Sequence, residues 1–333
     1  MFAEEKGRDE LMENTCGRKN SKLIGFVMSN ITLVILLLMV IIGALCTDSF
    51  LTWPNIKNVL RQVSINGVLA AGFTIVLLAD GFDLSMGSIV SACGVMAVGM
   101  LNDTRSALIA VLAALMLGAL FGAFNGTMIR IIKGDSSDSY LVTLGTSLLA
   151  TGVAYSYSGG YIMYPDAELT TLKSIAKGSL FGIPNLVIIM IAVMIMLEVM
   201  LKFTRTGRSF YMVGANKVAS YYSGINSHRI KTLSFVISGV CAGLGAVMMV
   251  FRAGGAGPAA GAGMEFNAAI AAIIGGNREG RVSSSMVKTL IGVLIFGLIS
   301  NVMNLMNINS SVQQVVKGII LLLALYSDLF RKE

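Results

Sequence analysis

The sequence predicts an all-α, polytopic membrane protein of about ten transmembrane helices. The chain has 333 residues, of which 55% are hydrophobic and only 13% are charged, whereas soluble domains carry about 25% charged residues. The apolar residues gather in long runs that charged or glycine-rich breaks separate. Because a bilayer core about 30 Å thick needs about 20 apolar residues per helix, little of the chain is left for a soluble domain.

The candidate spans follow these runs along a single transmembrane domain, residues 23–330. In order, they are 23–45, 60–80, 86–101, 106–132, 139–158, 183–203, 232–251, 264–277, 286–306 and 311–330. The third and the eighth are shorter than a membrane span requires. The first follows a charged tail, residues 1–22, and exceeds the apolar region of about 7–15 residues in a signal peptide, so we expect it to be retained. Residues 331–333 form a short end.

The charges between the spans predict the orientation. Lys and Arg concentrate in alternate connections, and cytoplasmic loops of membrane proteins carry this excess. The richest segments are the tail 1–22 and the connection 202–231. The alternation predicts that both termini are cytoplasmic. It also explains the net charge of +7 as membrane topology, so no nucleic-acid partner is needed.

Residues suited to catalysis or metal binding are scarce. His228 is the single histidine, which excludes His-ligated metals and Ser-His-Asp catalysis within the chain. The four cysteines lack the spacing of disulfide or metal sites, and no glycine-rich phosphate loop ending in Gly-Lys-Ser or Gly-Lys-Thr occurs. We therefore expect no enzyme activity, no metal and no cofactor in this chain.

The connection 202–231 is long and basic for a protein that only spans a membrane. Its stretch 216–222 predicts a short helix, which ends at the break of Gly224. Two interpretations are open. The loop is either a solvated connector or a docking segment for a cytoplasmic partner.

The chain also shows a weak correspondence between its two halves. If it divides into five spans and five, the second and seventh spans correspond, and each precedes a glycine-containing break. These breaks read "ADGFDLSMGS" (79–88) and "RAGGAGPAAGAG" (252–263). Interrupted segments at matching positions are typical of inverted repeats around a central pathway. The sequence thus predicts two five-helix inverted repeats.

Small and polar residues within the spans suggest packing faces and a pathway. Gly118, Gly122 and Gly126 share one helix face, and Gly239 and Gly243 share another; this spacing lets helices approach closely in lipid. Polar residues inside a membrane line pathways or pack between helices. The pathway candidates are Gln62, Asn66, Glu265, Asn267, Asn301, Asn304, Gln313 and Gln314. Uncharged amides dominate this set, and they suit the hydroxyl groups of sugars and other polyols.

Four long segments resemble the permease subunits of bacterial ABC importers for ribose and other simple sugars. They are "NIKNVLRQVSINGVLAAGFTIVLLADGFDLSMGS" (55–88), "GANKVASYYSGINSHRIK" (214–231), "EFNAAIAAIIGG" (265–276) and "TLIGVLIFGLISNVMNLMNINSSVQQVVKGIILLLAL" (289–325). The resemblance implies a ten-span fold in the bacterial inner membrane, where two permeases, identical or paralogous, form a path for a monosaccharide among membrane lipids. It further implies a cytoplasmic ATPase with two nucleotide-binding domains and an extracytoplasmic sugar-binding protein.

The resemblance also gives roles to single residues. The basic loop matches the family's coupling segment, a short helix that seats in a groove of the ATPase. Its residues here are Gly214, Asn216, Lys217, Ala219, Gly224 and Ile225. In the first break, Asp83 and Ser85 match positions that can cap the next helix, with Gly81 and Gly87 supplying the break. The alternative role for Asp83 is binding of an ion or of substrate.

Several positions depart from the family pattern. Lys217 stands where an acidic residue is common, Asp80 where a small polar residue is usual, and Asn267 where Asp is common; Phe82 replaces a smaller aliphatic residue, and 275–285 is shorter than usual. An importer for nucleosides, a furanose signalling molecule or branched amino acids is thus an alternative, although the charge-poor pathway argues against amino acids. A different class, an ion-coupled secondary transporter, has four candidate carboxylates: Asp80, Asp83, Glu198 and Glu265. A membrane scaffold leaves the loop and the paired breaks unexplained.

Overall fold

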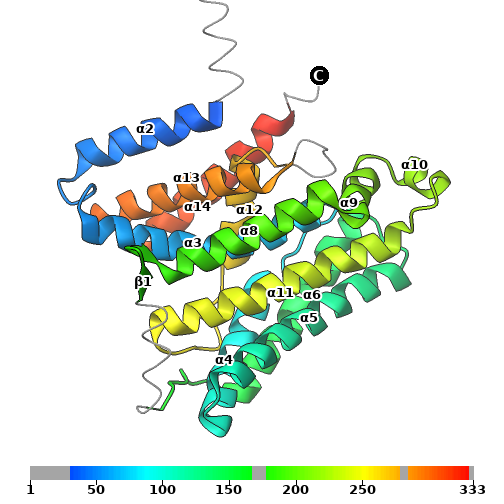
Figure 1. The fold of residues 1–333 in the computed structure, drawn as a ribbon, viewed down its shortest axis with the longest axis horizontal. Coiled ribbons are helices and arrows are strands. Elements are labelled where there is room, and N and C mark those ends of the chain that lie inside the picture. Colours follow the sequence, from blue (N-terminus) through cyan, green and yellow to red (C-terminus); the bar gives the residue numbers. More distant parts are fainter. Residues whose placement is uncertain (1–30, 167–177, 278–283, 330–333) are drawn as a thin grey trace, which may run out of the picture.

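The computed structural model describes residues 31–166, 178–277 and 284–329. The predicted tail 1–22, the start of the first span and the end 331–333 lie outside these residues. Within them the helices are α2 (Ile31–Cys46), α3 (Trp53–Leu78), α4 (Met86–Thr104), α5 (Ala107–Ile131), α6 (Ser136–Ser158), α8 (Asn185–Phe203), α9 (Arg205–Ala215), α10 (Lys217–Tyr222), α11 (Ser227–Ala253), α12 (Met264–Ile274), α13 (Met286–Leu305) and α14 (Ser310–Leu329). Figure 1 shows a bundle of long helices.

A small hairpin lies before α8. It is formed by β1 (Ser179–Leu180) and β2 (Ile183–Pro184), which pair antiparallel. In Figure 1 the hairpin lies at one end of the bundle, and α9 and α10 lie at the opposite end. The chain between them crosses the bundle once, as α8.

Every predicted span overlaps one of the helices in the described parts of the chain. Six of these helices, α3, α4, α5, α8, α11 and α13, are long and apolar enough to cross a membrane. The predicted all-α membrane class is therefore confirmed. The apolar stretches described in α2, α12 and α14 are shorter, and α6 is richer in hydroxyl side chains.

The helices differ from several predicted boundaries, most clearly in the second and third spans. The third span was expected to be short, but α4 runs for 19 residues to Thr104, because its polar end continues the helix beyond the apolar run. The second span was expected to begin at residue 60, but α3 begins at Trp53 with a proline in its first turn, where a missing N–H costs nothing. The eighth span is short as predicted, since α12 has 11 residues.

The centre of the bundle is made by α3, α4 and α11. In its most apolar stretch, α3 is 83% buried, whereas α5 is only 22% buried. The less buried of the two, α5, is the more apolar helix, which is typical of a membrane span whose outer face meets lipid. The buried residues of α5 recur about every fourth position, so one narrow stripe packs and the remaining face is left for lipid.

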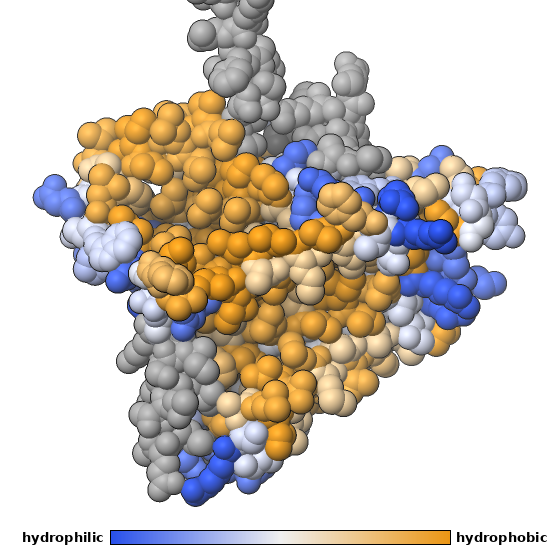
Figure 2. Space-filling model, viewed as in Figure 1, coloured by the Kyte–Doolittle hydropathy of each residue, from blue (hydrophilic) through white to orange (hydrophobic). Residues whose placement is uncertain are grey.

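The glycine faces predicted from the sequence pack against each other. Gly118 and Gly122 of α5 face Gly239 and Phe235 of α11, where a Cβ on either glycine would overlap a backbone carbonyl oxygen. The two helices therefore touch backbone to backbone, as the small-residue spacing predicts. Figure 2 shows hydrophobic residues over the sides of the long helices and hydrophilic residues at the ends, especially around α9 and α10.

Candidate functional site

The break between α3 and α4 is held by a buried carboxylate. Asp83 is fully buried, and its Oδ1 accepts hydrogen bonds from the N–H (3.0 Å) and the Oγ (2.6 Å) of Ser85. Its Oδ2 accepts from Ser238 Oγ of α11 at 2.7 Å. Asn125 of α5 donates to Ser85 Oγ at 2.8 Å. One carboxylate thus joins the break to α11 directly and to α5 through Ser85.

This geometry corrects the predicted helix cap. Ser85 occupies the N-cap position of α4, but its side chain accepts no hydrogen bond from the helix backbone. Instead it donates to Asp83. The carboxylate therefore anchors the break to other helices, and it lies beside the middle of α11 (Ser227–Ala253).

Hydroxyl groups of α6 satisfy the backbone of the same break. The pairs are Ser136 Oγ donating to the Asp80 carbonyl (3.0 Å), the Phe82 N–H donating to Ser139 Oγ (3.1 Å), and the Leu84 N–H donating to Thr143 Oγ1 (3.1 Å). Backbone without helical hydrogen bonds is stable within a membrane protein only where such partners replace them. The hydroxyls recur on one face of α6, so this face is built to hold the break.

The second break meets the first inside the bundle. After α11, the segment 254–263 packs against α4, where the Gly261 N–H donates to Ser91 Oγ at 2.9 Å. Gly87 allows this approach, because a Cβ there would overlap Glu265 and the Gly261 carbonyl. Glu265 Oε1 accepts from the Gly263 N–H at 3.2 Å. The starts of α4 and α12 therefore lie close together. Gly81, the other predicted break glycine, packs beside Phe235.

Amide side chains line two cavities that share one residue. A cavity of about 400 Å³ is lined by Gln62, Ile65, Asn66, Met249, Arg252, Ala253, Met264 and Asn267. A second, of about 480 Å³, is lined by Ala262, Gly263, Phe266, Asn267, Ile270, Gln314, Lys317, Gly318 and Leu321. Asn267 belongs to both. The structure thus brings four of the pathway candidates, from α3, α12 and α14, around the start of α12.

The other pathway candidates pair between helices. Asn301 and Asn55 exchange two amide hydrogen bonds, at 2.8 and 3.0 Å, and Gln313 Nε2 donates to Asn304 Oδ1 at 2.9 Å. Glu265 lies between the two breaks. These residues join the helices together, whereas the amides of the two cavities are available to a solute.

Sequence reasoning missed Arg252 and Phe266. Arg252, the first residue of the second break, donates to Asn58 Oδ1 at 3.3 Å and lines the first cavity. Phe266 lines the second cavity and is 45% exposed. In the sequence, Phe266 is marked only by its position next to Glu265 near the start of a predicted span.

The basic loop contains two helices where one was predicted. The predicted helix is α10, with Asn216 as its N-cap: the Asn216 side chain accepts from the Ala219 N–H at 2.9 Å. The preceding α9 was not predicted, because it is amphipathic rather than apolar along its length and so does not stand out as an apolar run. Gly224 has a positive φ of 75°, which ends the helix as predicted. Tyr221 and Tyr222 of α10 are 76% and 84% exposed.

Lys217 on α10 pairs with two carboxylates from other elements. Its Nζ lies 2.9 Å from Asp80 Oδ2 and 2.9 Å from Asp135 Oδ1. Burial lowers the pKa of Lys217, but its bonds to Asp135 and Asp80 outweigh this and hold that pKa above its usual value. The hydrogen bond and the charge of Lys217 lower the pKa of Asp135. Two of the positions that depart from the family pattern, Asp80 and Lys217, therefore pair with each other.

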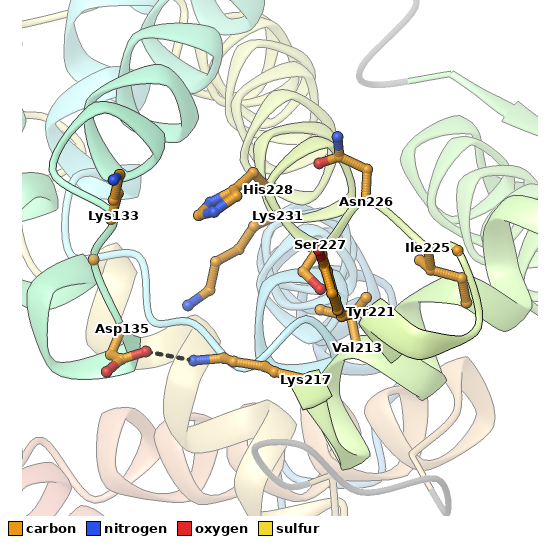
Figure 3. Close-up of a pocket in the computed structure, with 12 residues that line it drawn as sticks. Lys133, Asp135, Val213, Lys217, Tyr221, Ile225, Asn226, Ser227, His228 and Lys231 are labelled. Carbon is orange, nitrogen blue, oxygen red and sulfur yellow. Dashed lines mark hydrogen bonds and ion pairs between the residues drawn. The ribbon is translucent and has the colours of Figure 1, made fainter. Parts of the chain in front are cut away.

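This ion pair borders a cavity of about 570 Å³ at the end of the bundle, and several charged side chains line it. Lys133, Asp135, Lys217, His228 and Lys231 are among the residues lining it. In Figure 3 the side chains of Lys217 and Lys231 extend toward Asp135, and Lys133 and His228 lie on the same side of the cavity. The loop is therefore packed against the end of the bundle rather than extended away from it.

Comparison with known proteins places the chain among transport permeases. Residues 55–325 match the family described as branched-chain amino acid transport system, permease component. The chain is 36% identical to the ribose import permease RbsC of Escherichia coli K12, over 91% of this chain and 94% of that protein. It is 34% identical to RbsC of Bacillus subtilis, over 88% and 90%, and 32% identical to the D-allose permease AlsC of Escherichia coli K12, over 89% of each.

No solved structure matches the chain. The family match covers most of the chain, including both breaks, α9 and α10. The curated relatives named above are sugar permeases, although the family carries an amino-acid name. The chain belongs to this family of permease components of membrane transport systems.

Proposed function

We propose that this protein is the membrane permease of an ATP-binding-cassette importer for a monosaccharide such as ribose. The observation that carries the substrate class is the group of amides, Gln62, Asn66, Asn267 and Gln314, that line two neighbouring cavities. Amides donate and accept hydrogen bonds without charge, which suits a polyol. The curated relatives named for ribose and allose support the same class.

The chain provides the path and no chemistry. A separate cytoplasmic ATPase with two nucleotide-binding domains supplies the energy, and an extracytoplasmic binding protein delivers the sugar. A second permease, either a copy of this chain or a paralogue, completes the path in the bacterial inner membrane. The cavity that contains Gln314 and Lys317 is lined by residues of α12 and α14 and of the segment before α12, which suits a path shared with another subunit.

The proposed topology has ten spans in two inverted repeats, with both termini in the cytoplasm. Its support is the meeting of the two breaks at Gly87 and Gly261, since half-helices that begin side by side are typical of repeats around a pathway. Cysteine labelling of intact cells tests it, in a cysteine-free background. Phe181→Cys in the hairpin is expected to react with an impermeant reagent from outside, and Tyr222→Cys only after lysis. The reverse pattern would refute the orientation.

The proposed coupling segment comprises Gly214, Asn216, Lys217, Ala219, Gly224 and Ile225. Its support is that α10 is capped at both ends and presents two exposed tyrosines. When ATP closes the nucleotide-binding domains, motion of α10 shifts the bundle between outward and inward access. The break residues Gly81, Asp83, Ser85 and Gly87 form the helix break that gates the path.

Transport in proteoliposomes tests the function. The permease is reconstituted with its partner ATPase and sugar-binding protein, and uptake of ribose, allose and arabinose is measured. We expect ATP-dependent uptake of one of these sugars and none with a hydrolysis-deficient ATPase. Uptake that persists without ATP hydrolysis, or uptake that follows an ion gradient, would overturn the proposal.

A further inference from the structure

We infer that Lys217 is a positioning residue that ties α10 to the membrane break, so that displacement of α10 reaches Asp83 and the start of α4. We call the group Lys217, Asp80 and Asp135 the clasp. This inference rests on the proposed function, because it concerns how motion of the basic loop enters the membrane. It differs from docking, since the ammonium group of Lys217 faces the protein's own break.

The clasp joins three elements that are distant in the sequence. Lys217 begins α10, Asp80 follows α3, and Asp135 precedes α6. The two carboxylates differ in exposure: the side chain of Asp80 is 23% exposed and that of Asp135 is 80% exposed. Water screens exposed charges strongly, so the pair with Asp80 is the stronger mechanical link.

Asp80 is well placed to receive this link. It has a positive φ of 58°, a conformation that Asp adopts more readily than most side chains. Asp80 lies directly after the last turn of α3, and its N–H donates to the Leu77 carbonyl at 3.1 Å. The carboxylate therefore projects from the beginning of the break toward Lys217 of α10.

Hydrogen bonds to α6, α4 and α11 hold the backbone and side chains of the break between Asp80 and Asp83. The Asp80 carbonyl accepts from Ser136 Oγ of α6. Three residues later, Asp83 binds Ser85 at the start of α4 and Ser238 of α11. The intervening backbone at Phe82 is held by α6. Because so many hydrogen bonds fix the backbone between Asp80 and Asp83, this segment moves as a rigid unit. A displacement of Asp80 is therefore transmitted to Asp83.

Other charged groups border the clasp without forming the link. Lys133, His228 and Lys231 line the same cavity, and Asp138 accepts from the Asp135 N–H at 2.8 Å. Lys133→Gln is therefore a matched control, because it removes one positive charge from the same cavity and leaves the Lys217–Asp80 pair in place. Asp135→Asn removes the exposed partner alone.

A double-mutant cycle tests the clasp in the complete transporter. Lys217→Met keeps the stem without the charge, and Asp80→Asn keeps a side chain that tolerates the positive φ. Each is expected to lower sugar uptake per ATP hydrolysed by about fivefold or more, while the ATPase still co-purifies. The double variant is expected to be no worse than the worse single variant. Lys217→Arg is expected to retain coupling, as are Lys133→Gln and Asp135→Asn.

Hydrogen exchange on the permease alone gives a readout that needs no sugar. The amides of Phe82 and Leu84 are expected to exchange about three- to fivefold faster in Lys217→Met and Asp80→Asn, and unchanged in Lys133→Gln. Unchanged exchange and coupling in Lys217→Met would overturn the clasp, as would additive losses in the double variant. Loss of ATPase co-purification in Lys217→Met would overturn it too, by showing that Lys217 contacts the partner. Wild-type protein without ATP-dependent uptake would refute the proposed function, while the exchange result would still decide the clasp.

Discussion

The buried carboxylate of Asp83 allows a sharp separation of structure from charge. Three donors converge on it: the N–H and the Oγ of Ser85, and the Oγ of Ser238. In Asp83→Asn, the amide oxygen keeps both bonds from Ser85, and the amide nitrogen donates to Ser238 Oγ, which can accept. Because bonds to a neutral acceptor are weaker than those to a carboxylate, we expect a loss of about 1 kcal/mol in unfolding free energy.

Asp83→Leu removes every acceptor while keeping a similar size. The buried N–H of Ser85 then lacks a partner, at a cost of about 1–3 kcal/mol, and two serine hydroxyls each lose a bond to a carboxylate worth about 1.5–3 kcal/mol. The expected total is about 4–9 kcal/mol. Ser238→Ala is a control that removes one of the three donors, and we expect it to cost about 1.5–3 kcal/mol.

The assay combines thermal unfolding in detergent with sugar uptake in proteoliposomes. The anchoring role predicts that Asp83→Asn folds and transports, whereas Asp83→Leu unfolds at a clearly lower temperature. Equal destabilisation by Asn and Leu would refute the hydrogen-bond reasoning. A stable, assembled Asp83→Asn protein that no longer transports would instead show that the charge of Asp83 serves binding or gating.

Three further predictions concern packing, the path and pH. Gly122→Ala places a Cβ against an α11 carbonyl, and we expect it to lower the free energy of unfolding by about 1–3 kcal/mol. Gly145→Ala is the control, because open space surrounds that position, and we expect it to be neutral or stabilising. Equal effects of the two substitutions on thermal unfolding would contradict the close crossing of α5 and α11. Asn267→Ala is expected to lower uptake about three- to tenfold at unchanged stability, and normal uptake would remove Asn267 from the path. Lys217 lowers the pKa of Asp135, so the ionised carboxylate stabilises the folded wild type relative to Asp135→Asn. We expect this difference in unfolding free energy to persist at neutral pH and to decline below about pH 4, where the carboxylate becomes protonated. A decline near pH 7 would contradict this assignment.

The sequence alone determined the features that depend on local composition. Membrane class follows from hydropathy, because each span must be apolar along its own length. The helix α10 and its end at Gly224 follow from local capping chemistry, and the close helix crossing follows from glycine spacing. These signals lie within one turn or one span, so they need no knowledge of the neighbours.

Only the tertiary structure decided which polar residues meet. The pattern did not separate Asn267, which lines two cavities, from Asn301, which pairs with Asn55, because the same amide suits both roles. Likewise, Asp80 and Lys217 are two unrelated departures from the family pattern in the sequence, and only the fold brings Lys217 Nζ within 2.9 Å of Asp80 Oδ2. Hydropathy and periodicity are properties of the chain, whereas the partners of Asp83 and Lys217 depend on how distant helices pack together.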